Sequence, residues 1–134
     1  MASIKKFEEL EVWQKSRDQA NGIWELSCKG SLKNDYGLKN QINKSTGSVM
    51  DNIAEGFGRK GNVEFVNFLT YSSGSNDEVR SQIHRMKDRS HIDDRTYKNL
   101  LIKSNDLGIR INNFINYLNN SEFKGIKFKR KLKP

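Results

Sequence analysis

Residues 38–57 read LKNQINKSTGSVMDNIAEGF, and this segment decides the fold class. One set of its apolar and small residues recurs at intervals of three or four: Leu38, Ile42, Ser45, Val49, Ile53 and Phe57. This period is that of an α-helix with one buried face, and it excludes a strand, in which alternate residues share a face. Gly56, Gly58 and Gly61 predict the end of the helix, because glycine readily adopts the left-handed conformation of helix exits.

Three further segments show the same helical period, and their bounds are about 8–28, 62–89 and 94–119. Asn62 is the expected N-cap of the third predicted helix, and Asp93 or Asp94 that of the fourth, because short polar side chains accept hydrogen bonds from exposed helix amides. The chain is therefore predicted to be all-α. It is expected to form an antiparallel up-and-down four-helix bundle over residues 1–119, followed by a basic C-terminal tail over residues 120–134.

The composition predicts a thin hydrophobic core. Only 34% of the 134 residues are hydrophobic, against about 45–50% in an average globular chain. Copies of the chain are therefore expected to share apolar surface in a homo-oligomer, and Trp24, Tyr71 and Tyr117 are candidates for exposed aromatic contacts. The single proline, Pro134, is consistent with long uninterrupted helices.

Several classes of protein are excluded by what the sequence lacks. No segment approaches the ~18 apolar residues of a membrane span, and residues 1–10 lack the apolar region of a secretory signal, so a cytoplasmic protein is expected. The single cysteine, Cys28, and two distant histidines, His84 and His91, predict neither a metal site nor a cofactor. No catalytic motif is evident, and we expect no enzyme activity.

The positive charge of the chain is uneven and favours nucleic acid, RNA or DNA, as a partner. The formal net charge is +8, from 24 basic and 16 acidic residues. The segment 120–134 holds one acidic residue, Glu122, among many lysines. Basic side chains bind phosphates, and the residues predicted to do so are Lys44, Arg59, Lys60, Arg85, Lys87 and Arg89 in the bundle, with Lys127, Lys129, Arg130 and Lys131 in the tail. A solvated tail that only aids solubility is the alternative.

Two glycines within predicted helices have serine neighbours. Gly47 and Gly74 are each flanked by small hydroxyl residues, which predicts a close approach of two helix backbones with hydroxyls bonding across it. In that arrangement Gly74→Leu should lower stability by several kcal/mol through overpacking. Gly22 and Gly108 fit either a close approach or a solvent-exposed face.

Four short motifs resemble those of a known family of small bacterial proteins. They are residues 7–15 (FEELEVWQK), Tyr36-Gly37-Leu38 followed by Gln41-Ile42, residues 52–59 (NIAEGFGR), and Gly74-Ser75 with Glu78. The family comprises ribosomal-protein-like products encoded in intervening sequences of the large-subunit ribosomal RNA gene. A related branch is the accessory protein of diversity-generating retroelements, which partners a reverse transcriptase. This chain departs at Asn43, where relatives usually carry arginine, and at Met50-Asp51, where a proline is common.

The resemblance implies an antiparallel four-helix bundle that assembles into rings, typically pentamers, and associates with nucleic acid without catalysis. It also implies a protein partner such as a reverse transcriptase or a ribosomal component. Two functions of different class therefore stay open. One is a homo-oligomeric protein that binds structured RNA or a ribonucleoprotein through basic residues. The other is a protein–protein assembly module with no nucleic-acid role.

A structural polar network is predicted from the residues of the same motifs, namely Asn52, Glu55, Ser75 and Glu78, and a ligand or nucleic-acid site at these residues is the alternative. The Asn52 amide is expected to bond across to Ser75, and Glu55 to accept a hydrogen bond from an arginine or a helix-terminal amide. Buried polar groups of this kind fix the register of packed helices more than they add stability.

Overall fold

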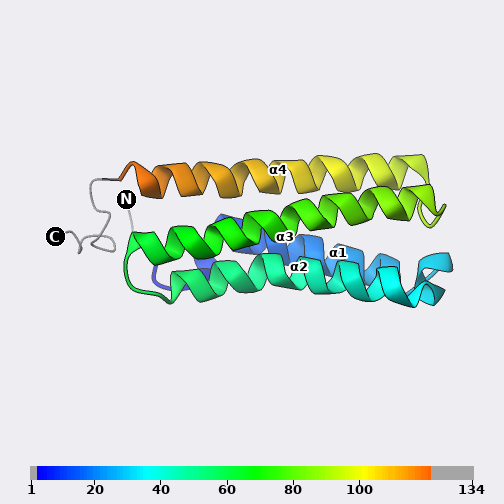
Figure 1. Ribbon diagram of the computed structural model, residues 1–134, viewed down its shortest axis with the longest axis horizontal. Coiled ribbons are helices and arrows are strands. Elements are labelled where there is room, and N and C mark those ends of the chain that lie inside the picture. Colours follow the sequence, from blue (N-terminus) through cyan, green and yellow to red (C-terminus); the bar gives the residue numbers. More distant parts are fainter. Residues whose placement is uncertain (1–2, 122–134) are drawn as a thin grey trace.

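The computed structural model describes residues 3–121, and the prediction of an all-α fold with four helices is confirmed. The described part contains no strand. Its helices are α1 (Glu11–Ser27), α2 (Tyr36–Phe57), α3 (Asn62–Asp88) and α4 (Asp94–Asn119), with 3₁₀ turns η1 (Phe7–Glu9) and η2 (Ser31–Asn34). Figure 1 shows the four helices along one long axis, with the chain reversing direction at each connection. Of the predicted tail, residues 122–134 lie outside the described residues.

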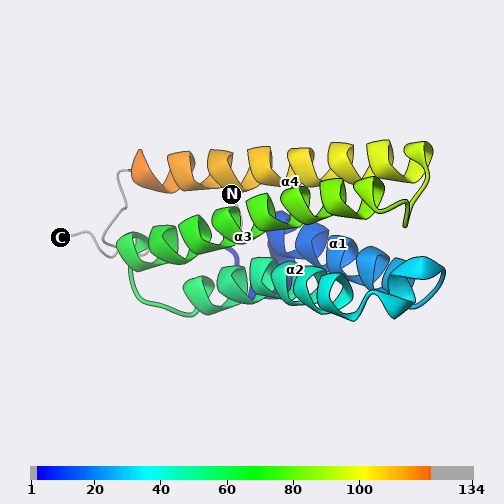
Figure 2. The ribbon, with the colours of Figure 1, turned by 45° about the vertical axis from the view of Figure 1, so that its right-hand side comes forward.

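The four helices do not pack equally against one another. α3 packs against both α2 and α4, and α1 packs mainly against α2, whereas α1 and α4 meet over a much smaller contact. In Figure 2 α4 lies beside α3, and α1 beside α2. The seam between α1 and α4 is therefore the most open side of the bundle.

The stripe on residues 38–57 faces the interior, as its period predicts. Leu38, Ile42, Val49 and Ile53 are fully buried and pack in one cluster with apolar residues of the other helices. At about 1.5–3 kcal/mol for each fully buried aliphatic side chain, this burial is the main favourable contribution to folding. The serine on the matching stripe of α3, Ser72, is also buried, and its hydroxyl donates to the Val49 carbonyl at 2.7 Å.

The helix starts differ from expectation in two places. Residues 7–9 form η1, so α1 begins at Glu11. The N-cap of α3 is Gly61 with a φ of 87°, and Asn62 is the first residue of the helix with a buried side chain. The expectation that Asn62 caps α3 is therefore wrong, because a glycine supplies the left-handed turn into the helix. Asp93 does cap α4, accepting from the Thr96 amide at 2.8 Å.

The close approach predicted at Gly47 and Gly74 is wrong for the glycines themselves, although hydroxyls of the same segments do bond between α2 and α3, as Ser72 does with Val49 and Ser48 with Ser75. A Cβ built at either glycine has no neighbour within 4 Å. Gly74 lies two residues from the buried Ser72, which on a helix places it on the opposite, exposed side. The close approach occurs instead at Gly56, where a Cβ would lie 2.6 Å from the Phe68 Cβ. The absence of a side chain at Gly56 therefore allows α3 to pack closely against α2. Gly56 itself lies within α2, and the helix ends one residue later, at Phe57, with Gly58 as its C-cap.

Candidate nucleic-acid interface

A polar groove runs along the outer face shared by α2 and α3. Its volume is about 390 Å³. Its lining side chains come from both helices: Gln41, Lys44, Ser45, Ser48, Glu78, Ser81, Gln82 and Arg85. The Arg85 guanidinium donates to the Gln41 side-chain oxygen at 2.6 Å, so a neutral amide and not a carboxylate holds it in place. The groove thus presents two cations beside several hydroxyl and amide groups.

Two members of the predicted polar network, Asn52 and Ser75, are joined on the same face through Ser48, which was not predicted. Glu55 accepts from Arg59 instead, and Glu78 makes no hydrogen bond within the described residues. The Asn52 amide donates to the Ser48 carbonyl and hydroxyl at 2.9 and 3.1 Å, and the Ser48 hydroxyl bonds with that of Ser75 at 2.9 Å. Asn52 therefore reaches Ser75 through Ser48 and not directly. Glu78 is exposed and lines the groove beside these hydroxyls. The carboxylate contributes negative charge that partly offsets Lys44 and Arg85.

The Arg59 side chain, just beyond the end of α2, is engaged by residues of both α2 and α3. Glu55 accepts from the Arg59 guanidinium at 2.7 Å, and Glu64 lies 3.9 Å from it. The guanidinium also lies 4.9 Å from the centre of the Phe68 ring, a cation–π distance. Arg59 is therefore held by two carboxylates of its own chain, which reduces its attraction for a phosphate.

The six described basic residues predicted to bind nucleic acid fall into two groups. Arg59 and Arg89 pair with carboxylates. Lys44, Lys60, Arg85 and Lys87 form no ion pair within residues 3–121. The structure brings Lys44 and Arg85 together in the groove, places Lys60 in the α2–α3 connection, and turns Lys87 toward the Tyr97 ring at 5.8 Å. Lys127, Lys129, Arg130 and Lys131 lie outside the described residues.

The groove also contains three neutral residues that were not predicted to bind nucleic acid: Gln41, Ser81 and Gln82. The Gln82 side-chain oxygen is buried and has no hydrogen-bond partner within the described residues. The signal that could have found these residues is helical spacing, since Gln41 lies three residues before Lys44, and Ser81 and Gln82 lie four and three before Arg85. That signal is weak without knowing which faces of α2 and α3 meet.

A second cluster joins the two loops at the far end of the bundle. His91, in the α3–α4 connection, bonds with the Ser31 hydroxyl at 2.7 Å and with the Asp35 carboxylate at 2.8 Å. Arg89 also donates to Asp35 at 2.8 Å. Asp35 in turn caps α2 by accepting from the Leu38 amide at 3.4 Å. The hydrogen bond from His91, followed by that from Arg89, lowers the pKa of Asp35 from 3.8 to about 2.

This lowered pKa predicts a dependence of stability on pH. The Asp35 carboxylate stabilises the fold fully above its unfolded pKa of 3.8, and this contribution is lost as the pH falls toward its folded pKa of about 2. We expect Asp35→Asn to be less stable than the wild type at pH 5 in urea titrations, and the difference to shrink between pH 4 and 2. Asp51→Asn, on the exposed side of α2, is the matched control. An equal difference for Asp35→Asn at pH 5 and pH 2.5 would contradict the assignment.

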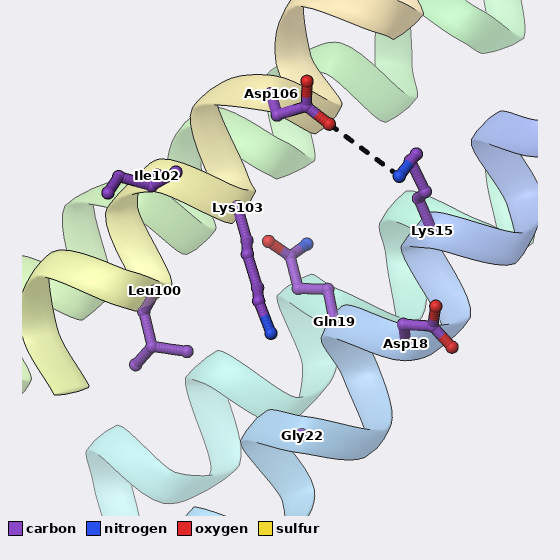
Figure 3. Close-up of a pocket in the computed structure, with 8 residues that line it drawn as sticks. All are labelled: Lys15, Asp18, Gln19, Gly22, Leu100, Ile102, Lys103 and Asp106. Carbon is purple, nitrogen blue, oxygen red and sulfur yellow. Dashed lines mark ion pairs between the residues drawn. The ribbon is translucent and has the colours of Figure 1, made fainter.

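A second groove lies along the open seam between α1 and α4. It has a volume of about 390 Å³, and Figure 3 shows Gln19, Leu100 and Lys103 around its opening. Two charged pairs bridge the seam between the helices: Lys15 of α1 lies 4.0 Å from Asp106 of α4, and Arg110 of α4 contacts Glu11 of α1 at 2.9 Å. Arg110 also pairs with Asp106 of its own helix at 2.8 Å. Both signs of charge alternate here, so this groove is a poorer phosphate site than the one between α2 and α3.

No group of three or more histidine, cysteine or acidic side chains suited to a metal occurs within residues 3–121. Among the described helices, none combines the length and apolar character that crossing a bilayer requires. Four long helices with a polar, partly basic groove on one side define a class of protein, the small four-helix bundles.

Within that class, the chain belongs to the 23S rRNA-intervening sequence protein family, whose model matches residues 8–113. Its fold is also similar to the crystal structure of a protein of unknown function from the S23 ribosomal protein family of Bacteroides thetaiotaomicron VPI-5482. The TM-score is 0.71 at 19% identity, and the match covers 78% of this chain and 97% of the other. No curated protein matches the chain. The family resemblance of the sequence motifs is thereby confirmed.

Proposed function

We propose that the protein is a non-catalytic, homo-oligomeric nucleic-acid-binding protein, and that the groove between α2 and α3 binds the phosphate backbone of structured RNA. The observation that carries this proposal is the placement of Lys44 and Arg85 in one groove where, although Glu78 also lines it, neither cation forms an ion pair within the described residues. Cations that form no ion pair with their own chain are available to phosphates, and phosphate binding releases the counterions condensed on the nucleic acid, which is the main electrostatic source of affinity.

The neutral side chains of the groove support the same proposal. Hydroxyl and amide groups contact phosphates and sugars in most protein–nucleic acid complexes and set the register of the protein on its ligand. Ser48, Ser81 and Gln82 place such groups in the same groove as the two cations. The family name refers to the intervening sequences of 23S ribosomal RNA, and it is consistent with an RNA ligand for this chain.

Charge reversal in the groove tests the proposal. We expect Lys44→Glu with Arg85→Glu to weaken binding of a hairpin RNA with single-stranded flanks by about tenfold or more in a shift assay at moderate salt. The control is Arg95→Glu with Lys98→Glu, which makes the same change of net charge on α4, where Asp94 already neutralises Lys98 at 3.0 Å. Equal loss in both double variants would mean that only net charge matters and would contradict a site in the groove.

The salt dependence measures how many phosphates are contacted. Six contacts with single-stranded RNA give a slope of about −4 in log affinity against log salt, at ~0.7 per contact. Removing residues 120–134 and repeating the titration separates the tail from the bundle. Binding that does not change between low and moderate salt would contradict the electrostatic proposal for both.

An assembly module remains the second candidate, because apolar side chains stay exposed on a single protomer. Val63 is 70% exposed, and Ile102, Ile109 and Tyr117 are between 59% and 66% exposed. Exposed apolar surface of this kind fits contacts between copies, for which a ring such as a pentamer is our expectation, or contacts with a reverse transcriptase or a ribosomal component. Light scattering on the purified chain tests the oligomer, and a monomer would contradict it. An oligomer that binds no RNA at any salt would favour the second candidate.

A further inference from the structure

Two exposed aromatic rings lie where α1 is joined to α2. Trp24, in the last turn of α1, is 53% exposed, and Tyr36, the first residue of α2, is 70% exposed. The connection between them carries two exposed lysines, Lys29 and Lys33. A third lysine, Lys39, places its Nζ 5.5 Å from the centre of the Trp24 ring. This end of the bundle therefore carries two exposed aromatic rings together with three lysines.

Other exposed aromatic rings of the chain have apolar neighbours instead. Tyr71 packs edge-on against Phe68 at 5.6 Å, and Tyr117 stacks on Phe114 at 6.4 Å. The other tryptophan, Trp13, is half-buried and packs against Phe7 at 5.2 Å, with the Arg17 guanidinium 5.6 Å from its ring centre. Trp24, by contrast, is exposed, packs on no other aromatic ring within residues 3–121, and has a lysine ammonium over its face. The rings of Tyr71 and Tyr117 therefore suit contact with another apolar surface. The Trp24 ring, with lysines around it, suits a negatively charged ligand that contains aromatic rings.

Nucleobases linked by phosphates are the ligand chemistry that matches this pattern. A base that stacks on an aromatic side chain contributes roughly 5- to 100-fold in affinity, whereas an exposed cation–π contact contributes only about two- to fivefold. A base can therefore replace the Lys39 ammonium on the Trp24 ring, and the released ammonium can then pair with a phosphate. In a duplex the faces of the bases are already stacked, so only unpaired nucleotides can bind in this way.

We propose that the α1–α2 end, defined by Trp24, Lys29, Lys33, Tyr36 and Lys39, binds unpaired bases of a single-stranded segment by stacking, while its lysines bind the adjoining phosphates. This inference rests on the proposed nucleic-acid binding and adds a second contact to it, apart from the groove between α2 and α3. The protein would then recognise the single-stranded parts of an RNA, such as loops and flanks, in addition to its phosphate backbone.

Tryptophan fluorescence gives a direct test, because the chain has only two tryptophans. The variant Trp13→Phe leaves Trp24 as the sole reporter. We expect a single-stranded oligonucleotide of about ten adenosines to quench this emission by roughly half or more at saturation, since a stacked base quenches indole. Heparin, a polyanion without bases, and a blunt RNA duplex are expected to bind with little quenching. Saturable oligonucleotide binding without quenching would overturn the inference and leave the proposed function standing.

Matched variants complete the test. Trp24→Ala is expected to weaken oligonucleotide binding about tenfold and to leave heparin binding within about twofold, because stacking contributes nothing to the binding of heparin. Tyr71→Ala, an exposed aromatic that packs on Phe68, is expected to change neither. A change of oligomeric state in Trp24→Ala, with oligonucleotide affinity unchanged, would show that the ring contacts a second copy and would overturn the inference. Failure of the Trp13→Phe protein to bind heparin, duplex or oligonucleotide would contradict the proposed function itself.

Discussion

Gly56→Leu is expected to lower the free energy of unfolding by about 3 kcal/mol. A Cβ at this position would lie 2.6 Å from the Phe68 Cβ and 3.0 Å from the Phe65 Cδ1. The first of these atoms is fixed to the backbone of α3, and Phe65 is itself only 2% exposed. Neither can move away alone, so α2 and α3 must separate. The measurement is a urea titration followed by circular dichroism.

The matched control is Gly74→Leu, which is also within a long helix. Gly74 has open space around it, and leucine is a better helix former than glycine by nearly 1 kcal/mol. We therefore expect this variant to be as stable as the wild type or slightly more so, in place of the large loss that its serine neighbours suggested. Equal destabilisation by the two substitutions would show that the packing at Gly56 is not special.

Asn76→Ala is the second substitution with a large expected effect, a loss of about 2–3 kcal/mol. Asn76 is 1% exposed and joins three helices. Its amide donates to the Ser104 carbonyl of α4 at 2.9 Å, and its oxygen accepts from the Gln19 amide of α1 at 3.1 Å. Alanine removes these two hydrogen bonds and a third, longer one from the Ser104 hydroxyl at 3.5 Å. It also leaves a small cavity beside Gly108, where an added Cβ would lie 3.3 Å from the Asn76 nitrogen.

The control for this prediction is Gln19→Ala, which removes only the contact at the partly exposed rim of the network. It should lower stability by less than about 1 kcal/mol, because water can replace the lost hydrogen bond. Thermal and urea unfolding of both variants give the comparison. An Asn76→Ala protein within about 0.5 kcal/mol of the wild type would contradict the bridging role.

The helices could be predicted from the sequence because their signals are local. The stripe from Leu38 to Ile53 is buried as expected, and Asp93 caps α4. The same local reasoning failed at Gly74 and Asn62, where small or polar residues were given packing or capping roles. Whether a glycine meets a neighbouring helix depends on how that helix is rotated, and adjacent residues carry no information on this rotation.

The candidate site could be predicted in part. Lys44 and Arg85 were both selected for their charge, but only the packing of α2 against α3 brings them into one groove with Gln41. Arg59 and Arg89 were selected on the same ground, and the fold pairs each with a carboxylate. The partner of Arg89, Asp35, is far away in the sequence, and no spacing rule links the two.

The amino-acid sequence alone determined that this chain forms four amphipathic helices, since hydrophobic period, caps and propensities act over a few residues. The tertiary structure alone decided which of their polar and basic side chains meet, because each such contact depends on the angle and register at which two helices pack. Burial of the apolar stripes holds the helices together. The small set of close contacts at Gly56, Asn76 and Ser48 then fixes one arrangement among those that the stripes allow.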